Sequence, residues 1–145
     1  IAAGLARDGH VYILDDATLD GARPDVWAAR ALATYHRHEA DALIAEINQG
    51  GAMVAEVLRS IDASVPVTTV RATRGKLLRA EPVAALYAQG RVHHLGAFPA
   101  LEDEMANFGP DGLSQGRSPD RLDALVWAVT ALALDREGSP RLRRL

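Results

Sequence analysis

The sequence contains no cysteine, only 5% aromatic residues and no long apolar run. Without cysteine the chain cannot build a disulfide framework or a thiolate zinc site, and this composition fits a reducing compartment. No apolar run approaches the roughly 20 residues that a membrane span needs, and no signal peptide is visible. The sequence therefore predicts a cytoplasmic protein without a membrane partner.

A strong charge of one sign is also lacking, because the net charge is -3 and the pI is near 5.9. Any binding to nucleic acid must therefore rest on a local basic patch. What is present is the composition of a globular protein, with 48% hydrophobic and 24% charged residues in a chain of 145. This length suits a single domain with its own core.

Short apolar runs alternate with helical patterns along the chain. Residues 1–15 predict two antiparallel strands around Asp8-Gly9, a dipeptide that favours a type I′ hairpin turn. Ser118 is expected to cap the last helix, and Gly90 to close an earlier one. The fold class is thus α/β, a mixed sheet flanked by helices. Helices are expected over residues 23–38, 52–61, 77–89, 98–108 and 118–135, strands over 41–47, 65–72 and 91–96, and a polar loop over 109–117.

One acidic residue interrupts the apolar run LIAEINQGG, residues 43–51. Glu46 is predicted near the carboxyl end of a buried strand, where an unpaired charge is costly. Either an arginine pairs with it, the strand end is solvated, or a metal ion binds it.

Two further carboxylates start the last helix. Asp120 and Asp123 are three residues apart and therefore lie on one helix face. Acidic residues also favour a helix N-terminus simply because of the helix dipole. If this helix packs beside the strand of Glu46, however, the carboxylates converge as ligands for hard cations such as Mg²⁺. Two such ions, about 3.5 to 4 Å apart, are known to support phosphodiester hydrolysis.

Basic residues are concentrated upstream of a predicted helix and near the proposed carboxylate site. They are either phosphate contacts or a solvated loop and helix start. The few aromatic residues fit a double-stranded rather than a single-stranded substrate. The segment RGKL lacks the other residues of a P-loop, so this chain contains no ATP motor. The candidate DNA-binding residues are Arg71, Arg74, Lys76, Arg79, Arg117 and Arg121.

Five sequence blocks, in their order and spacing, carry a family resemblance: RDGHVYILDDATL, LIAEINQGGAMV, TRGKLLRAEPVAALYAQGRVHHLG, FPALEDEMANF and SPDRLDALVWA. Together they resemble the C-terminal nuclease domain of the large terminase subunit of tailed bacteriophages and gene transfer agents. The resemblance implies a ribonuclease H-like fold and an endonuclease that cuts double-stranded DNA during genome packaging with two Mg²⁺ or Mn²⁺ ions. It further implies work in the host cytoplasm at the procapsid, with the terminase ATPase domain, the portal and the small terminase subunit as partners.

The resemblance also assigns roles to individual residues. Glu46 matches the second-strand catalytic carboxylate, Asp120 the late catalytic carboxylate at the start of the last helix, and Asp123 an accessory metal ligand or an orienting group. Lys76 becomes the foremost substrate contact of the basic cluster. The family's first catalytic aspartate has no match here and is expected on a strand upstream of Ile1. Another ribonuclease H-like nuclease, such as a junction resolvase, and a docking module that has lost its site remain as alternatives.

Overall fold

Three strands form the first sheet of the computed structural model, which describes residues 1–47, 52–113 and 118–134. Strands β1 (Ala2–Leu5) and β2 (Val11–Asp15) are antiparallel, with a register irregularity at Ala2/Ala3. Strand β5 (Val92–His94) lies parallel to β2 on its other side. The mixed strand directions predicted from the sequence are therefore confirmed.

The turn between β1 and β2 differs from the predicted type I′ turn. Among the described residues of this turn only Gly9 has a positive φ, +84°, whereas a type I′ turn needs two. The Gly9 N–H donates to the Ala6 carbonyl (3.0 Å), and the Ala6 N–H donates to the His10 carbonyl (2.9 Å). This pattern is a type I turn followed by a glycine in the left-handed conformation. The loop is longer than a two-residue type I′ turn, and it matches the twist of the two strands with a single glycine.

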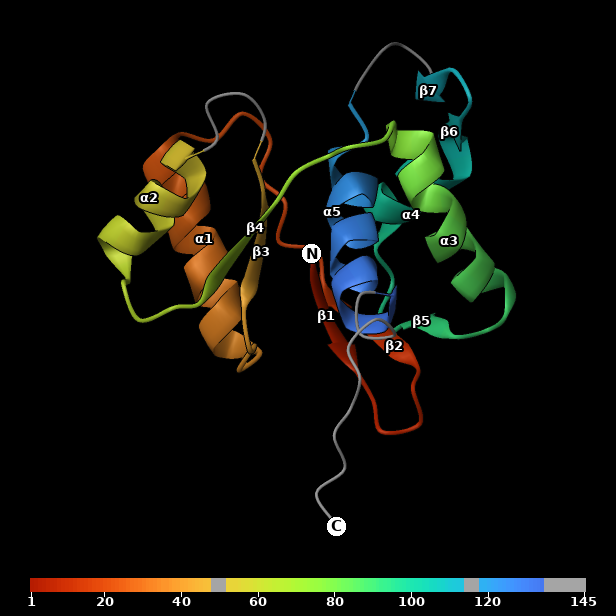
Figure 1. The fold of residues 1–145 in the computed structure, drawn as a ribbon, viewed down its shortest axis with the longest axis horizontal. Helices are drawn as coiled ribbons and strands as arrows, with labels where there is room; N and C mark the ends of the chain where they lie inside the picture. The colour runs from red at the N-terminus through yellow and green to blue at the C-terminus, as the bar shows by residue number, and fades with distance from the viewer. Residues whose placement is uncertain (48–51, 114–117, 135–145) are drawn as a thin grey trace.

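A second group of elements contains a parallel strand pair. Strands β3 (Leu43–Glu46) and β4 (Val67–Val70) pair with Glu46 opposite Val70, and helix α2 (Ala52–Ile61) connects them. Helix α1 (Pro24–Arg37) begins at a proline, as predicted, and packs with α2. Figure 1 shows both helices beside β3 and β4. Their shared buried cluster consists of Ala28, Leu32, Leu58 and Val65.

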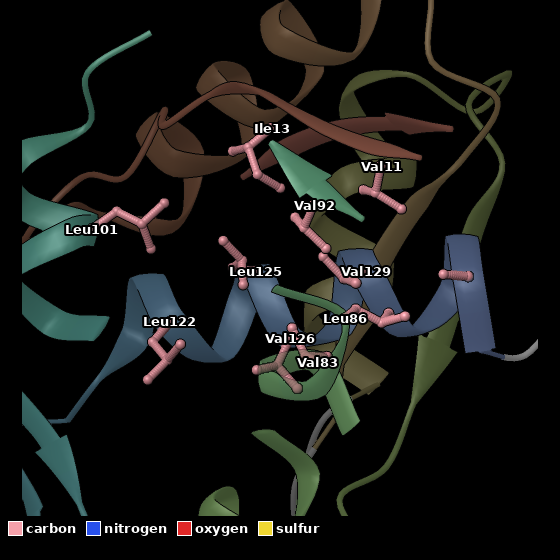
Figure 2. Close-up of a cluster of buried hydrophobic side chains, with 11 residues drawn as sticks. Val11, Ile13, Val83, Leu86, Val92, Leu101, Leu122, Leu125, Val126 and Val129 are labelled. Atoms are coloured by element: carbon pink, nitrogen blue, oxygen red, sulfur yellow. The ribbon is translucent and has the colours of Figure 1, made fainter. Parts of the chain in front are cut away.

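Three further helices gather around the first sheet (Figure 1). They are α3 (Lys76–Ala88), α4 (Pro99–Asn107) and α5 (Asp120–Val129), and α5 continues into a π-helical turn, η2 (Thr130–Leu134). Figure 2 shows the apolar face of α5 directed at side chains from the strands and from α3. This face places the first turn of α5 at a fixed position relative to the sheet. The buried cluster comprises Val11, Ile13, Val83, Leu86, Val92, Leu101, Leu122, Leu125, Val126, Val129 and Ala133.

Two local predictions around α5 are wrong. Part of the predicted loop 109–117 forms an antiparallel ribbon of β6 (Phe108–Gly109) and β7 (Gly112–Leu113), while residues 114–117 lie outside the described structure. Ser118 does not cap α5; its hydroxyl instead accepts a hydrogen bond from Lys76 Nζ (2.9 Å). The N–H of Leu122, in the first turn of α5, instead donates to Glu104 Oε2 from α4 at 3.0 Å.

The two main groups of strands do not join into one hydrogen-bonded sheet within the described residues. β1 pairs only with β2, and β3 pairs only with β4. Side chains make contacts between the groups in two places: around the end of β3, and where Arg37 and His38 at the end of α1 meet Asp15 of β2. No helix in the described part of the chain is long and apolar enough to cross a membrane.

Candidate metal site at the end of strand β3

Glu46 lies at the last position of β3, as predicted, and its side chain is 22% exposed. Both of its carboxylate oxygens have protein partners. Arg79 Nη1 lies 3.5 Å from Oε1, and the indole Nε1 of Trp127 donates to Oε2 at 3.0 Å. The arginine partner that the sequence left as one alternative is therefore present.

Asp123 is the carboxylate of α5 that shares this arginine. Arg79 Nη2 lies 2.9 Å from its Oδ1, and Lys76 Nζ lies 3.2 Å from its Oδ2. The Asp123 side chain is only 12% exposed. One guanidinium thus stands between Glu46 and Asp123, which brings the end of β3, the start of α3 and the first turn of α5 together. We call Glu46, Lys76, Arg79, Asp123 and Trp127 the carboxylate–arginine cluster.

Arg79 is held on its flat face as well as at its edge. Its guanidinium carbon lies 4.8 Å from the centroid of the Trp127 ring, a cation–π arrangement. The side chain is 10% exposed, and its Nε is buried without a hydrogen-bond partner among the described residues. The indole therefore contacts both members of the ion pair, Glu46 through its N–H and Arg79 through its face.

Asp120 occupies a different environment from Asp123. It is exposed and lines a pocket of 710 Å³ together with Asp20, Glu104 and Arg121. Among the described residues Asp120 and Glu46 share no hydrogen-bond or ion-pair partner, whereas Asp123 and Glu46 share Arg79. Of the two aspartates that begin α5, the structure brings Asp123 to Glu46.

Comparison with known proteins places the chain in a family. A family model described as the terminase RNaseH-like domain matches residues 3–132. The chain is a terminase RNaseH-like domain. Among solved structures it resembles the crystal structure of the large terminase nuclease from thermophilic phage G20c, with a TM-score of 0.60 and 18% identity. That match covers 77% of this chain and 64% of the phage nuclease chain, and it supports the predicted fold. No curated protein matches the chain.

The basic residues predicted to contact DNA divide into two groups in this terminase domain. Arg71 and Arg74 are exposed in the segment between β4 and α3. Because β3 and β4 are parallel and Glu46 pairs with Val70, Arg71 directly follows the strand end beside Glu46. Lys76 and Arg79 instead bind the carboxylates of the cluster.

Arg121 lies away from the carboxylate–arginine cluster in an acidic environment. Its guanidinium approaches Asp16, Asp20 and Glu104 at 3.3 to 3.4 Å, and the side chain is 18% exposed. Burial alone lowers the pKa of Arg121, but hydrogen bonds to Glu104 and Asp20 and the charge of Asp16 together raise it. The last predicted basic residue, Arg117, lies outside the described residues.

Sequence reasoning missed Trp127 as a partner of Glu46. The signal was its spacing, because Trp127 follows Asp123 by four residues and therefore lies on the same face of α5. Lys76 and Arg79 share a face of α3 for the same reason. Helical spacing identifies such pairs, but it does not say which distant strand they meet.

The donors of the terminase domain fit a hard divalent cation in number and type. Mg²⁺ is commonly held by one or two carboxylates together with waters and substrate phosphates. Glu46 and Asp123 provide two carboxylates, and the guanidinium of Arg79 now lies between them. In the described part of the chain no group of three or more acidic or histidine side chains is arranged so that it could hold a metal ion by itself.

Proposed function

We propose that this terminase domain is a metal-dependent endonuclease that cuts double-stranded DNA during genome packaging. One observation carries the proposal: in a terminase RNaseH-like chain, the strand-end Glu46 and the helix-start Asp123 bind the same guanidinium. Glu46 and Asp123, which are far apart in the sequence, are therefore held close to the same guanidinium. Such a pair of oxygen donors suits Mg²⁺ or Mn²⁺.

Glu46 and Asp123 are the proposed core ligands, and the resemblance adds Asp120 as a catalytic carboxylate. We propose that a further aspartate lies on a strand upstream of Ile1. Within the described residues β1 and β3 each pair with one strand, which supports this part of the proposal, since each has an edge on which another strand can pair. When bound, two divalent ions activate a water and stabilise the leaving oxygen of a phosphodiester.

The protein's own part is to bind and orient the DNA. The exposed Arg71 and Arg74 follow the strand beside Glu46, and guanidinium groups there bind phosphate oxygens without reading sequence. Trp127 orients Glu46 through its indole N–H. The terminase ATPase domain, the portal and the small terminase subunit are the proposed partners, at the procapsid in the host cytoplasm.

Plasmid cleavage with Mg²⁺ or Mn²⁺ tests this function. The assay compares residues 1–145 with a version that carries the upstream strand, each with Glu46→Gln, Asp123→Asn or Asp120→Asn. Folded Glu46→Gln and Asp123→Asn proteins are expected to lose cleavage, whereas Glu56→Gln, the same change on the exposed face of α2, is expected to keep it. Full activity in folded Glu46→Gln would overturn the proposal.

The same assay separates the alternative functions. Preference for branched over linear DNA would indicate a junction resolvase. Absence of cleavage in both versions, together with absence of Mn²⁺ binding, would indicate a docking module that has lost its site. If Asp120→Asn reduces cleavage more than Asp123→Asn does, Asp120 is the main catalytic carboxylate of α5, as the resemblance implies.

A further inference from the structure

We propose that Arg79 is a built-in competitor of the divalent cation, so that a cation binds Glu46 and Asp123 only when the guanidinium withdraws from between them. This inference rests on the proposed function and adds to it how the site is kept closed. It follows from the position of Arg79, which bonds to both carboxylates and is 10% exposed.

The charges of the cluster argue for competition rather than coexistence. Glu46 and Asp123 carry two negative charges, and Arg79 and Lys76 carry two positive charges within 2.9 to 3.5 Å of them. The cluster is therefore neutral, and it offers a dication no net attraction. A dication added beside an unmoved guanidinium would also face a like charge in a poorly solvated place.

The hydrogen bonds lead to the same conclusion. Each carboxylate accepts hydrogen bonds from fixed protein donors: Glu46 from Arg79 and Trp127, and Asp123 from Arg79 and Lys76. A metal ion needs these same oxygens. Arg79 is the donor that both carboxylates share, so its departure frees an oxygen on each of them at once.

The hydrogen bonding of Arg79 in the cluster is also incomplete, which favours its withdrawal. Its buried Nε has no hydrogen-bond partner in the described residues, which is a cost to the closed arrangement. The flexible side chain projects from the first turn of α3, close to the exposed segment of Arg71 and Arg74. Withdrawal toward that segment would place a third guanidinium where phosphates are proposed to bind.

Binding of Mn²⁺ to metal-stripped protein, followed by the free-ion electron paramagnetic resonance signal, tests the proposal. Arg79→Met is expected to bind Mn²⁺ at least about tenfold more tightly than the unchanged protein. Tenfold corresponds to the lower end of the coupling energies found for close charge pairs. Arg79→Lys keeps the charge and is expected to stay within about threefold of the unchanged protein. Arg30→Met removes the same charge from an exposed position on α1 and is expected to change nothing.

The outcomes separate this inference from the proposed function. Suppose that Glu46→Gln abolishes Mn²⁺ binding but Arg79→Met binds Mn²⁺ no more tightly than the unchanged protein. Glu46 is then a metal ligand, and the proposal that Arg79 competes with the metal is overturned. If Mn²⁺ binds in no variant, or binds independently of Glu46, the metal site itself is overturned and the competitor with it.

A second measurement needs no metal. In chelator, Arg79→Met is expected to lower the urea midpoint more in the unchanged background than in the Glu46→Gln/Asp123→Asn background, because there the guanidinium has no charged partners. Equal shifts in both backgrounds would show that Arg79 is not the counter-ion of this pair and would overturn the inference.

Discussion

Arg121 shows how a basic side chain is used inside the molecule. It is 18% exposed and approaches Asp16 and Asp20, from the segment between β2 and α1, and Glu104 of α4. Replacing it with methionine leaves the largely buried carboxylates of Asp16 and Glu104 without their shared counter-ion. Arg121→Met is therefore expected to lower the free energy of unfolding by about 2 kcal/mol, less than for a fully buried pair. Urea unfolding at pH 7 measures this change.

The salt dependence of the Arg121→Met effect identifies its cause. Added salt screens the repulsion between the carboxylates that remain, so the loss of stability should shrink as the ionic strength rises. Arg30→Met serves as the control for the removal of one surface charge and should cost little. A loss that stays the same up to molar salt would mean that lost packing, not charge, explains the effect.

Glu102 provides a prediction about pH and stability. The Phe98 N–H donates to Glu102 Oε1 at 3.2 Å, and His94 lies 3.1 Å from the same oxygen. In that order, these contacts lower the pKa of Glu102 from 4.5. A carboxylate with a lowered pKa stabilises the fold above its unfolded pKa, and this contribution disappears as the pH falls through the folded value.

Glu102→Gln should therefore be less stable than the unchanged protein at pH 6 to 7, and the difference should fade as the pH drops below 4.5. Urea midpoints measured from pH 7 to pH 3 give the comparison. Glu56→Gln, an exposed carboxylate on α2, should show no such pH-dependent difference. A difference between Glu102→Gln and the unchanged protein that grows with acid would contradict the assigned direction of the pKa.

At the scale of elements, the start of α5 depends on a neighbouring helix. Glu104 of α4 accepts the Leu122 N–H at 3.0 Å and also approaches Arg121 at 3.3 Å. The sequence predicted Ser118 for the capping role. Glu104→Ala is expected to cost about 1 to 3 kcal/mol, whereas Ser118→Ala is expected to cost about 0.5 kcal/mol or less. Thermal unfolding of both variants makes the comparison, and the reverse order would restore Ser118 as the cap.

The sequence predicted the helices and strands well where the signal was local. Apolar spacing indicated α1 and α2, and Pro24 and Gly90 marked where α1 begins and α3 ends. It failed where two distant segments decide the outcome. The N-terminal cap of α5 comes from Glu104, and a local motif such as Ser118-Pro119 cannot indicate an acceptor on another helix.

The candidate site shows the same division between local and distant information. The sequence indicated Glu46 as an acid in an apolar strand and Asp123 as a neighbour of Asp120 on one helix face. It did not show that Arg79, 33 residues after Glu46, reaches both. Charge and spacing identify residues that need partners, whereas the packing of α3 and α5 on the first sheet decides which partners they meet.

At the scale of the whole molecule, two hydrophobic clusters are connected by polar contacts. One cluster lies between the first sheet and α3, α4 and α5, and the other lies among α1, α2, β3 and β4. The carboxylate–arginine cluster spans them, because Glu46 belongs to β3 and its partners belong to α3 and α5. The connection places the candidate metal site where the two groups of elements meet.

We expect the two clusters to unfold together as one domain, which is the organisation predicted from the sequence. Leu125 is fully buried in the first cluster and Leu58 is buried in the second. Leu125→Ala and Leu58→Ala should each cost about 2 to 5 kcal/mol and shift one shared transition. Far-ultraviolet circular dichroism should give the same urea midpoint as the fluorescence of Trp27, which packs against the second cluster, and of Trp127, which lies in the carboxylate–arginine cluster. If Leu58→Ala shifts only the Trp27 signal, the two groups of elements are separate folding units, and the site between them opens independently of either core.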